Sequence, residues 1–558
     1  MKTGIIQLWI SAIAFALLSG CGVIPFKAST NDKADAAAPP SPQVSFKLRE
    51  TRFKQTKSGG QVDCNPKRHK DVLVLLALSG GGSRAALLSG LSMLQMQDVD
   101  GVDVLSDVDL ISSVSGGSLA AAYYAVSGDE NAASVDAEIE ATCGQSVSGR
   151  VWSTKEVTRL MTKNYILPWV GNWFWPDNIA LYWFSTYDRT DMMAQTFADN
   201  LFDTSIVGRD LRMSELNPSR PNLIVNATQG SPNDLRGGTR SNEFGQPFTF
   251  TEEDFAAICS RVDTYEISRA VMASATFPGV FNFMTLKNRC PGGDYVHLFD
   301  GGNSDNLGLT SIKRELWNLN DPAENASGPK LSDYRKIIVI LIDAYTDSNG
   351  VDEHDNDPRK WYDYVVDTNF ITATDSLLAK NRDNLVAQFE RKDVFPYAES
   401  DSCTKPDADI RSKLYLSNAE QEQLEFDEQR KRTLECQRFF SWKRPEDVND
   451  ICDNADRRVA PLNDLIRHKM LFVHVSFADI GDVTNAKNAD LNRQLNRIAT
   501  DFRLSGNRNP QTGLTNQQAI ECAVPLLFGR NNDCGDISYT ASHLSKSKWR
   551  EVRDALSN

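Results

Sequence analysis

Two short segments rich in glycine and serine carry groups that could stabilise or attack an acyl carbonyl. The first, residues 78–84 (LSGGGSR), joins an apolar run of strand length to a segment with helical spacing of apolar residues. Gly80, Gly81 and Gly82 permit backbone angles closed to other residues, so several N–H groups can converge at a helix N-terminus. Such a cluster of amides binds negative charge, either a phosphate or the oxyanion of an acyl-transfer intermediate.

The glycine loop is open to two other interpretations. Residues 80–85 also fit the G-x-G-x-x-[GA] pattern of dinucleotide-binding loops, which requires an acidic residue at the end of the second strand. Asp98, Asp100 and Asp103 precede that expected strand, however, and a serine turn closes it. A P-loop is excluded because the Lys-Ser/Thr pair is missing. A tight turn without chemical function is the remaining alternative.

The second segment, residues 111–118 (ISSVSGGS), lies between an expected strand and an expected helix. A G-x-S-x-G nucleophile elbow occupies this place in a fold and lifts its serine clear of the sheet. Ser115 is therefore the candidate nucleophile, with Ser113 and Gly117 at the positions of the two glycines. The N–H of Gly116 would join those of the glycine loop in an oxyanion hole, where one lost donor typically costs about 3 kcal/mol. A serine- and glycine-rich turn of no chemical importance is the alternative.

A serine nucleophile needs a base that accepts its proton. Residues 296–299 (VHLF), of strand character, lead into Asp300, which two glycines follow. A carboxylate in this position can project into a cleft, and the glycines let another backbone approach closely. Asp300 is therefore the candidate base, although Asp-Gly pairs also commonly begin turns.

A second arrangement follows the chain order of α/β-hydrolases, with Ser115, Asp343 and His474 as a triad. Asp343 ends the strongest apolar run of the chain, at residues 337–342. His474, however, lies inside an expected strand at 471–477, whereas a triad histidine belongs on a loop. The Ser115–Asp300 pair is the favoured arrangement.

At this point the sequence resembles the patatin-like phospholipases. The signatures of that family are a glycine-rich oxyanion loop ending in a basic residue, a G-x-S-x-G elbow and a D-G-[GA] aspartate. They match residues 80–84, 113–117 and 300–302 in the family's order, and residues 273–278 are similar to its segment upstream of the aspartate. The resemblance covers about residues 71–343. It implies a serine–aspartate dyad that cleaves acyl esters of phospholipids or lysophospholipids without histidine, and no cofactor is expected.

Two positions differ from the family's glycines, and a third, Arg84, has two possible roles. Ala85 and Ser113 replace glycines of the family, so a catalytically weak or inactive lipid-binding envelope protein with the same fold is the alternative function. Arg84 closes the glycine loop. It is a candidate for contacting a phosphate, and equally for steadying the loop at the start of the helix.

Uniformly apolar strands alternate with helices from about residue 71 onward, which predicts a mainly parallel sheet covered on both faces. With the resemblance, the expected fold is the three-layer α/β patatin-like fold, over residues 66–345. Residues 346–558 form an accessory region. A capping box at 417–420 opens a charged helix that runs to about residue 440, and the strand at 471–477 can rejoin the core sheet.

The N-terminus has the pattern of a bacterial lipoprotein. A positive start and a short apolar run indicate a signal peptide over residues 1–20, and it ends in Leu-Ser-Gly before Cys21. Cys21 is the expected lipidation site. Gly22 follows where an aspartate would resemble an inner-membrane retention signal, so the outer membrane is expected. Residues 21–65, rich in Ala, Pro and Ser, are expected to be a flexible tether.

Composition narrows the function further. The 558 residues are 41% hydrophobic with a formal charge of -14, and no basic stripe is present, so nucleic-acid partners are excluded. Nine cysteines remain beside Cys21, without a C-x-x-C pair, and no metal site is supported. Cys436 with Cys452 and Cys522 with Cys534 are close enough in sequence to form disulfides.

Residues 164–191 are densely aromatic and include Trp169, Trp173, Trp175 and Trp183. Two interpretations stay open for this stretch. It forms an acyl-binding wall or a lid that dips into a membrane interface, where amphipathic rings are favoured. Alternatively, it forms a packed aromatic subcore.

Overall fold

A computed structural model describes the chain from residue 31 to residue 557 with gaps. The expected signal peptide, Cys21, the capping box at 417–420 and Trp183 lie outside the described residues. The described ranges are 31–33, 44–46, 53–55, 61–65, 68–129, 148–175, 179, 182, 187–202, 209–231, 245–278, 281–321, 328–346, 380–395, 436–437, 439–440, 442–443, 445–480, 485–498, 503–504, 506–535 and 537–557.

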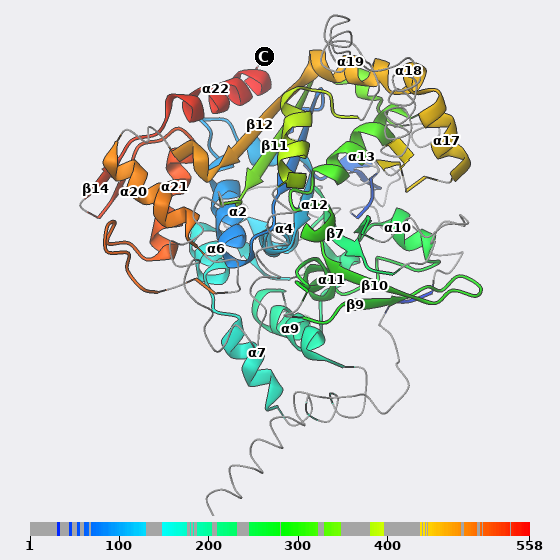
Figure 1. The fold of residues 1–558 in the computed structure, drawn as a ribbon, viewed down its shortest axis with the longest axis horizontal. Coiled ribbons are helices and arrows are strands. Elements are labelled where there is room, and N and C mark those ends of the chain that lie inside the picture. The colour runs from blue at the N-terminus through cyan, green and yellow to red at the C-terminus, as the bar shows by residue number, and fades with distance from the viewer. Residues whose placement is uncertain are drawn as a thin grey trace, which may run out of the picture.

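One central sheet organises the described residues (Figure 1). Its strand order is β12-β11-β3-β4-β7-β10-β9, with β8 paired to β7. The five strands from β12 to β7 are parallel, whereas β10, β9 and β8 are antiparallel to their neighbours. The bounds are β3 Val72–Leu78, β4 Val108–Val114, β7 Asn222–Gln229, β8 Pro247–Thr249, β9 Met284–Lys287, β10 Tyr295–Asp300, β11 Lys336–Asp343 and β12 Met470–Ser476.

Both faces of the sheet are buried, which explains the continuous apolar runs of β3 and of residues 337–342 in β11. Along β3, Val74 and Leu76 belong to one hydrophobic cluster, whereas Leu73 and Leu75 belong to another. Successive side chains of a strand point to opposite faces, so a continuous apolar run must be covered twice. The expected three-layer α/β architecture with a mainly parallel sheet is confirmed.

Helices form the two outer layers. The first cluster holds side chains of α2, α4, α6, α9, α11, α21 and α22, and the second holds side chains of α13, α17 and α19. Their bounds are α2 Gly82–Met96, α4 Gly116–Val126, α6 Thr154–Met161, α9 Arg189–Phe197, α11 Ile267–Ser274, α13 Leu309–Asn320, α17 Pro445–Asp453, α19 Ala460–Lys469, α21 Asn516–Leu527 and α22 His543–Ser557. The remaining helices are α3 Val104–Asp107, α7 Ile166–Trp173, α10 Glu252–Ala257, α12 Gly302–Asp305, α18 Ala455–Arg458 and α20 Ala486–Asn496. None of the helices in the described ranges is long and apolar enough to cross a membrane.

The region after residue 345 packs closely on the core. β12 lies in register beside β11, from Ile337 opposite Met470 to Asp343 opposite Ser476. In Figure 1, α20–α22 lie to the left of β11 and β12, and α17–α19 lie to their upper right. The expected disulfides Cys436–Cys452 and Cys522–Cys534 are confirmed, and Cys259–Cys290 was not foreseen.

The expected tether is not free along its whole length. Asn31 is fully buried and exchanges two hydrogen bonds with the backbone of Lys287. Val44 and Phe46 belong to the two hydrophobic clusters on opposite faces of the sheet. The prediction of a flexible segment was wrong at these points, because Asn31 is held by hydrogen bonds and the apolar Val44 and Phe46 pack on the domain.

We therefore expect Phe46→Ala to lower the free energy of unfolding by roughly 3 kcal/mol, since a buried ring would be lost. Chemical denaturation of the full chain measures this change. Phe174→Ala is the matched control, because Phe174 is 70% exposed and should change stability little. An equal, small effect of both variants would show that the segment does not dock.

Candidate active site

Ser115 stands at the sharp turn between β4 and α4. Its backbone angles are φ 49° and ψ −121°, which a residue other than glycine adopts only under strain. The N–H of Ser115 donates to Oγ of Ser274 at 2.8 Å, and this contact holds the turn from the end of α11. The side chain is 8% exposed. The turn is the strand-to-helix elbow that the sequence predicts.

The elbow and the glycine loop are in direct backbone contact. A Cβ on Gly116 would lie 2.0 Å from the carbonyl oxygen of Gly82, and a Cβ on Gly117 would lie 2.6 Å from that of Ser79. Neither distance is possible for a real side chain, so both positions require glycine. The two motifs therefore form one site at the ends of β3 and β4.

Asp300 ends β10 and reaches the serine. Oγ of Ser115 donates to Oδ2 of Asp300 at 2.9 Å, and the N–H of Gly302 donates to Oδ1 at 2.8 Å. Burial raises the pKa of Asp300 to about 6, and the hydrogen bonds from Gly302 and Ser115 oppose this rise. The backbone N–H of Asp300 donates to the carbonyl of Thr276, so the carboxylate is held from two sides.

The predicted oxyanion donors divide into two groups. The N–H of Gly80 donates to the carbonyl of Asn306 at 2.9 Å, so the prediction of this residue as an oxyanion donor was wrong. Gly81 caps α2 with φ 138°, and Gly82 begins the helix with φ 58°. Gly82 and Gly116 are the first residues of α2 and α4, so their N–H groups, like that of the capping Gly81, have no acceptor within the helix. All three amides stand at helix N-termini beside Ser115, the arrangement that favours developing negative charge.

The serine at the family's glycine position is accommodated by a buried hydroxyl network. Oγ of Ser113 donates to the carbonyl of Ile224 at 3.2 Å and accepts from Oγ of Ser118 at 3.1 Å. The hydroxyls of Ser118 and Ser274 are also 3.1 Å apart, and Ser274 donates to the carbonyl of Asn226. Ser113 thus strengthens the support of the elbow instead of disturbing it.

Ala85 is equally compatible with the loop. It lies inside α2, it is fully buried, and its N–H donates to the carbonyl of Gly81. Its backbone does not have a positive φ, so this position does not demand glycine.

The alternative triad does not assemble. Nε2 of His474 lies 3.0 Å from Oδ2 of Asp343, but both side chains belong to strands on the other side of β3 from Ser115. With strands about 4.8 Å apart, His474 on β12 is three strand spacings, roughly 14 Å, from the line of β4. The hydroxyl of Ser115 is directed to Asp300 instead.

Asp343 serves as the anchor of a charged cluster. Its carboxylate accepts from His474 and from Nη2 of Arg382 at 2.6 Å, and these contacts lower its pKa to about 2 although burial opposes the change. The cluster borders a cavity of about 540 Å³ between β12, α20 and α22.

Arg84 connects the glycine loop to the region that follows the core. Its guanidinium is buried and donates to the carbonyl of Ile498 and, at 3.4 Å, to the hydroxyl of Thr346. The expectation of a phosphate contact is not met, because this buried charge is already bonded to the accessory region. Arg84 instead joins the glycine loop to residues that follow the core in sequence.

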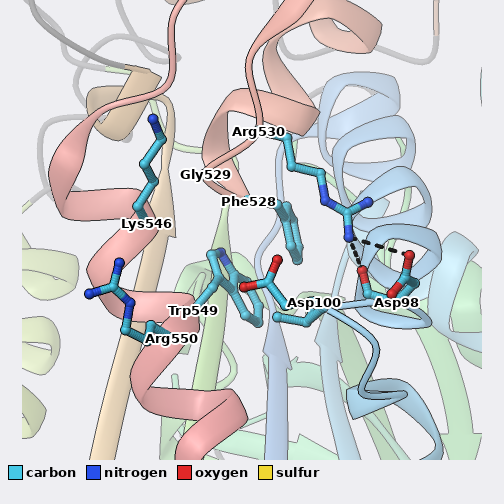
Figure 2. Close-up of a pocket in the computed structure, with 9 residues that line it drawn as sticks. Asp98, Asp100, Phe528, Gly529, Arg530, Lys546, Trp549 and Arg550 are labelled. Carbon is cyan, nitrogen blue, oxygen red and sulfur yellow. Dashed lines mark hydrogen bonds and ion pairs between the residues drawn. The ribbon is translucent and has the colours of Figure 1, made fainter.

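A second cavity, of about 220 Å³, lies where α22 meets the turn at residues 98–100 (Figure 2). Phe528 and Trp549 stack at its base with ring centroids 4.2 Å apart. Lys546 and Arg550 project from α22 away from Asp98 in Figure 2, so the charged groups do not converge on one point. No group of three or more potential metal ligands occurs among the residues that the structure describes.

The sequence did not identify Ser274, Asn226 or Asn306 as parts of the site. Ser274 lies in the segment 273–278, which the sequence singled out only by its family resemblance and without a role for Ser274. Asn226 donates to Oγ of Ser112 and to the carbonyl of Ser113, both at 2.9 Å, from within an apolar strand. A buried asparagine in β7 was the available signal, since buried amides require partners.

Comparisons with known proteins give a family match and distant structural likenesses. Residues 76–312 match the family model described as patatin-like phospholipase. No curated protein sequence matches the chain. Among solved structures, human GIVD cytosolic phospholipase A2 is similar over 51% of this chain and 44% of its own, with 11% identity and a TM-score of 0.27. VipD from Legionella pneumophila is similar over 55% and 54%, with 15% identity and a TM-score of 0.19.

The chain thus spans only about half the length of these structures, and the likeness is too low to carry an argument about either. The family match includes the glycine loop, the elbow and the aspartate in one segment, and it supports lipid acyl hydrolysis in general. The likeness to the patatin-like phospholipase family thus rests on residues 76–312, fewer than half of the 558 residues.

Proposed function

We propose that this protein hydrolyses acyl esters of phospholipids or lysophospholipids, with Ser115 as nucleophile and Asp300 as base. The observation that carries the proposal is the 2.9 Å hydrogen bond from Oγ of Ser115 to Oδ2 of Asp300 at the strained elbow. The substrate class rests on the family match of residues 76–312.

In the first half of the reaction, Oγ of Ser115 attacks the acyl carbonyl carbon while its proton moves to Asp300. The carbonyl oxygen becomes an oxyanion, which the amides of Gly81, Gly82 and Gly116 stabilise. The acyl C–O bond then breaks, and the departing alcohol or lysolipid takes the proton from Asp300. An acyl group remains on Ser115.

Water completes the cycle. Asp300 accepts a proton from the attacking water, a second oxyanion forms in the same place, and the C–O bond to Ser115 breaks. The fatty acid leaves and Ser115 regains its proton. An aspartate can serve as base here because burial brings its pKa to about 6, nearer to neutral pH than the usual value of 3.8.

The cellular setting belongs to the same proposal. Cys21 would carry the lipid that holds the protein to the bacterial outer membrane, and the pattern of residues 1–22 supports it. The substrate would then be met at a membrane surface.

We expect Ser115→Ala and Asp300→Asn each to reduce ester hydrolysis by at least about 1,000-fold, because the nucleophile or its base is lost. His474→Ala should retain most activity, since His474 contacts Asp343 rather than Ser115. Release of fatty acid from a lysophospholipid and covalent labelling by a fluorophosphonate probe measure both effects. Labelling of Ser115→Ala, or loss of labelling in His474→Ala alone, would contradict the proposed dyad.

The pH dependence of kcat/KM should follow the carboxyl of Asp300. The rate should fall about tenfold per pH unit below about 6, because the protonated acid cannot accept the serine proton. The folded-state pKa is raised, so the native protein holds this proton more tightly than the unfolded chain does. The stability contributed by Asp300 is therefore greatest below pH 3.8 and is lost as the pH rises through about 6.

The Asp300→Asn variant tests the link between the pKa of Asp300 and stability by a measurement that does not depend on enzyme activity. The rise in pKa from 3.8 to about 6 corresponds to roughly 3 kcal/mol, so at pH 8 the variant should be at least as stable as wild type. Thermal unfolding at pH 5 and pH 8 measures the difference. A variant that is destabilised at pH 8 would contradict the buried, charged base.

Arg84 should act on the reaction through the position of the glycine loop. We expect Arg84→Ala to lower kcat about tenfold with little change in KM, because the amides of Gly81 and Gly82 lose their connection to Ile498. Arg84→Lys should restore part of the rate. If KM rose for phospholipids alone while kcat stayed constant, Arg84 would be a contact to the substrate phosphate.

A further inference from the structure

The described residues include six large apolar side chains that are exposed, and four of these six lie between residues 167 and 175, in α7 or just after it. Leu167 is 69% exposed, Val170 43%, Phe174 70% and Trp175 63%. Leu167, Val170 and Phe174 follow the spacing i, i+3 and i+7, so they share one face of the helix. Residues 166–175 (ILPWVGNWFW) contain no charged side chain.

The opposite side of α7 is packed on the domain. The indole N–H of Trp169 donates to the carbonyl of Arg189 at 2.9 Å, and its ring lies 5.5 Å from that of Phe281. Asn172 donates to Oγ1 of Thr196 in α9 at 2.9 Å. The aromatic stretch is therefore divided into a packed inner side and an exposed outer side, and each of the two sequence interpretations describes one of them.

The exposed face is connected to the candidate active site through a short series of contacts. α7 rests on α9, and Asp191 of α9 forms an ion pair with Arg269 of α11. α11 ends at Ser274, whose hydroxyl accepts from the N–H of Ser115. Figure 1 shows α7 projecting from the lower end of the molecule, below α9 and α11. A surface that contacts α7 would thus lie in fixed relation to the elbow.

Positive charge accompanies the apolar face although the chain as a whole is acidic. Lys155, Arg159 and Lys163 recur at intervals of four along and just beyond α6, which leads directly into α7. Arg159 is paired with Glu156, so Lys155 and Lys163 supply the net positive charge of this segment. Arg150 is close enough to act electrostatically on Lys163, as Arg159 does. An apolar helix rich in tryptophan and phenylalanine, with cations beside it, fits the boundary between the headgroups and acyl chains of a bilayer.

We propose that the outer face of α7, formed by Leu167, Val170, Phe174 and Trp175, inserts into the surface of a phospholipid bilayer. The proposal rests on the proposed function for the choice of a lipid surface as the partner. The inserted rings replace contact with water by contact with acyl chains, and the cations of α6 lie toward anionic headgroups. The site would then receive its substrate from the bilayer to which the domain is docked.

The test is binding of the full chain carrying Cys21→Ser to vesicles, so that no acyl group on residue 21 contributes. Leu167→Gln, Phe174→Gln and Trp175→Gln combined should lower the vesicle partition coefficient at least about 100-fold, on the order of tenfold for each large side chain. Leu544→Gln is the matched control, because Leu544 is 57% exposed on α22 and should leave partitioning unchanged. Co-sedimentation with phosphatidylcholine vesicles measures both.

The contribution of the cationic side chains beside α7 is tested with vesicles that contain the anionic lipid phosphatidylglycerol. Lys155→Gln should weaken binding to them about fivefold and leave binding to phosphatidylcholine vesicles unchanged. Equal partitioning of the triple variant and its parent, or an equal loss for Leu544→Gln, would overturn the proposal.

Hydrolysis of a water-soluble short-chain ester separates this proposal from the proposed function. The triple variant should keep the parent's rate on that ester, because α7 does not contact Ser115, while it loses hydrolysis of vesicle lipid. If the parent cleaves no ester but its partitioning still depends on α7, the enzyme proposal fails and the docking surface stands. If the rate on the soluble ester also falls, α7 acts on the fold of the site, and the docking proposal fails.

Discussion

The close approach of two backbone segments is the constraint on which the candidate site depends. Gly116 touches the carbonyl of Gly82, and Gly117 touches that of Ser79, at distances that exclude any side chain. This contact places the starts of α2 and α4 side by side at neighbouring strands β3 and β4. It therefore places the N-termini of α2 and α4 beside the turn that carries Ser115, and helix N-termini favour negative charge.

The strain at Ser115 is distributed over a polar layer beneath the elbow. The N–H of Ser115 is bound by Ser274, whose own hydroxyl is bound by the backbone of β7. Asn226 of β7 reaches the backbone of Ser113, just before the elbow, and accepts from Ser311 of α13. Because buried polar groups are costly when unpaired, this chain of hydrogen bonds favours a single arrangement of the elbow.

Local sequence was sufficient for the parts of the site that depend on short-range geometry. The three motifs have glycines wherever a carbonyl or a side chain approaches, so the elbow, the loop and Asp300 could be predicted from spacing. The prediction of Gly80 as an oxyanion donor was wrong because its N–H is taken by the carbonyl of Asn306, more than 200 residues away. The same reason applies to Arg84, whose partner Ile498 belongs to a region without a recognisable pattern. At the level of the fold, continuous apolar strands such as β3 predicted a sheet buried on both faces. The alternating burial of β10 is the local feature that accompanies its antiparallel pairing.

The docking of Asn31 on β9 sets a limit on geometry at the N-terminus. Only nine residues lie between Cys21 and Asn31, which is fully buried against Lys287 and Ser260. A fully extended chain of that length reaches at most about 35 Å. A lipid on Cys21 would therefore keep the β9 edge of the sheet within about 35 Å of the membrane. The short connecting segment would also limit how far the domain can rotate relative to the membrane surface.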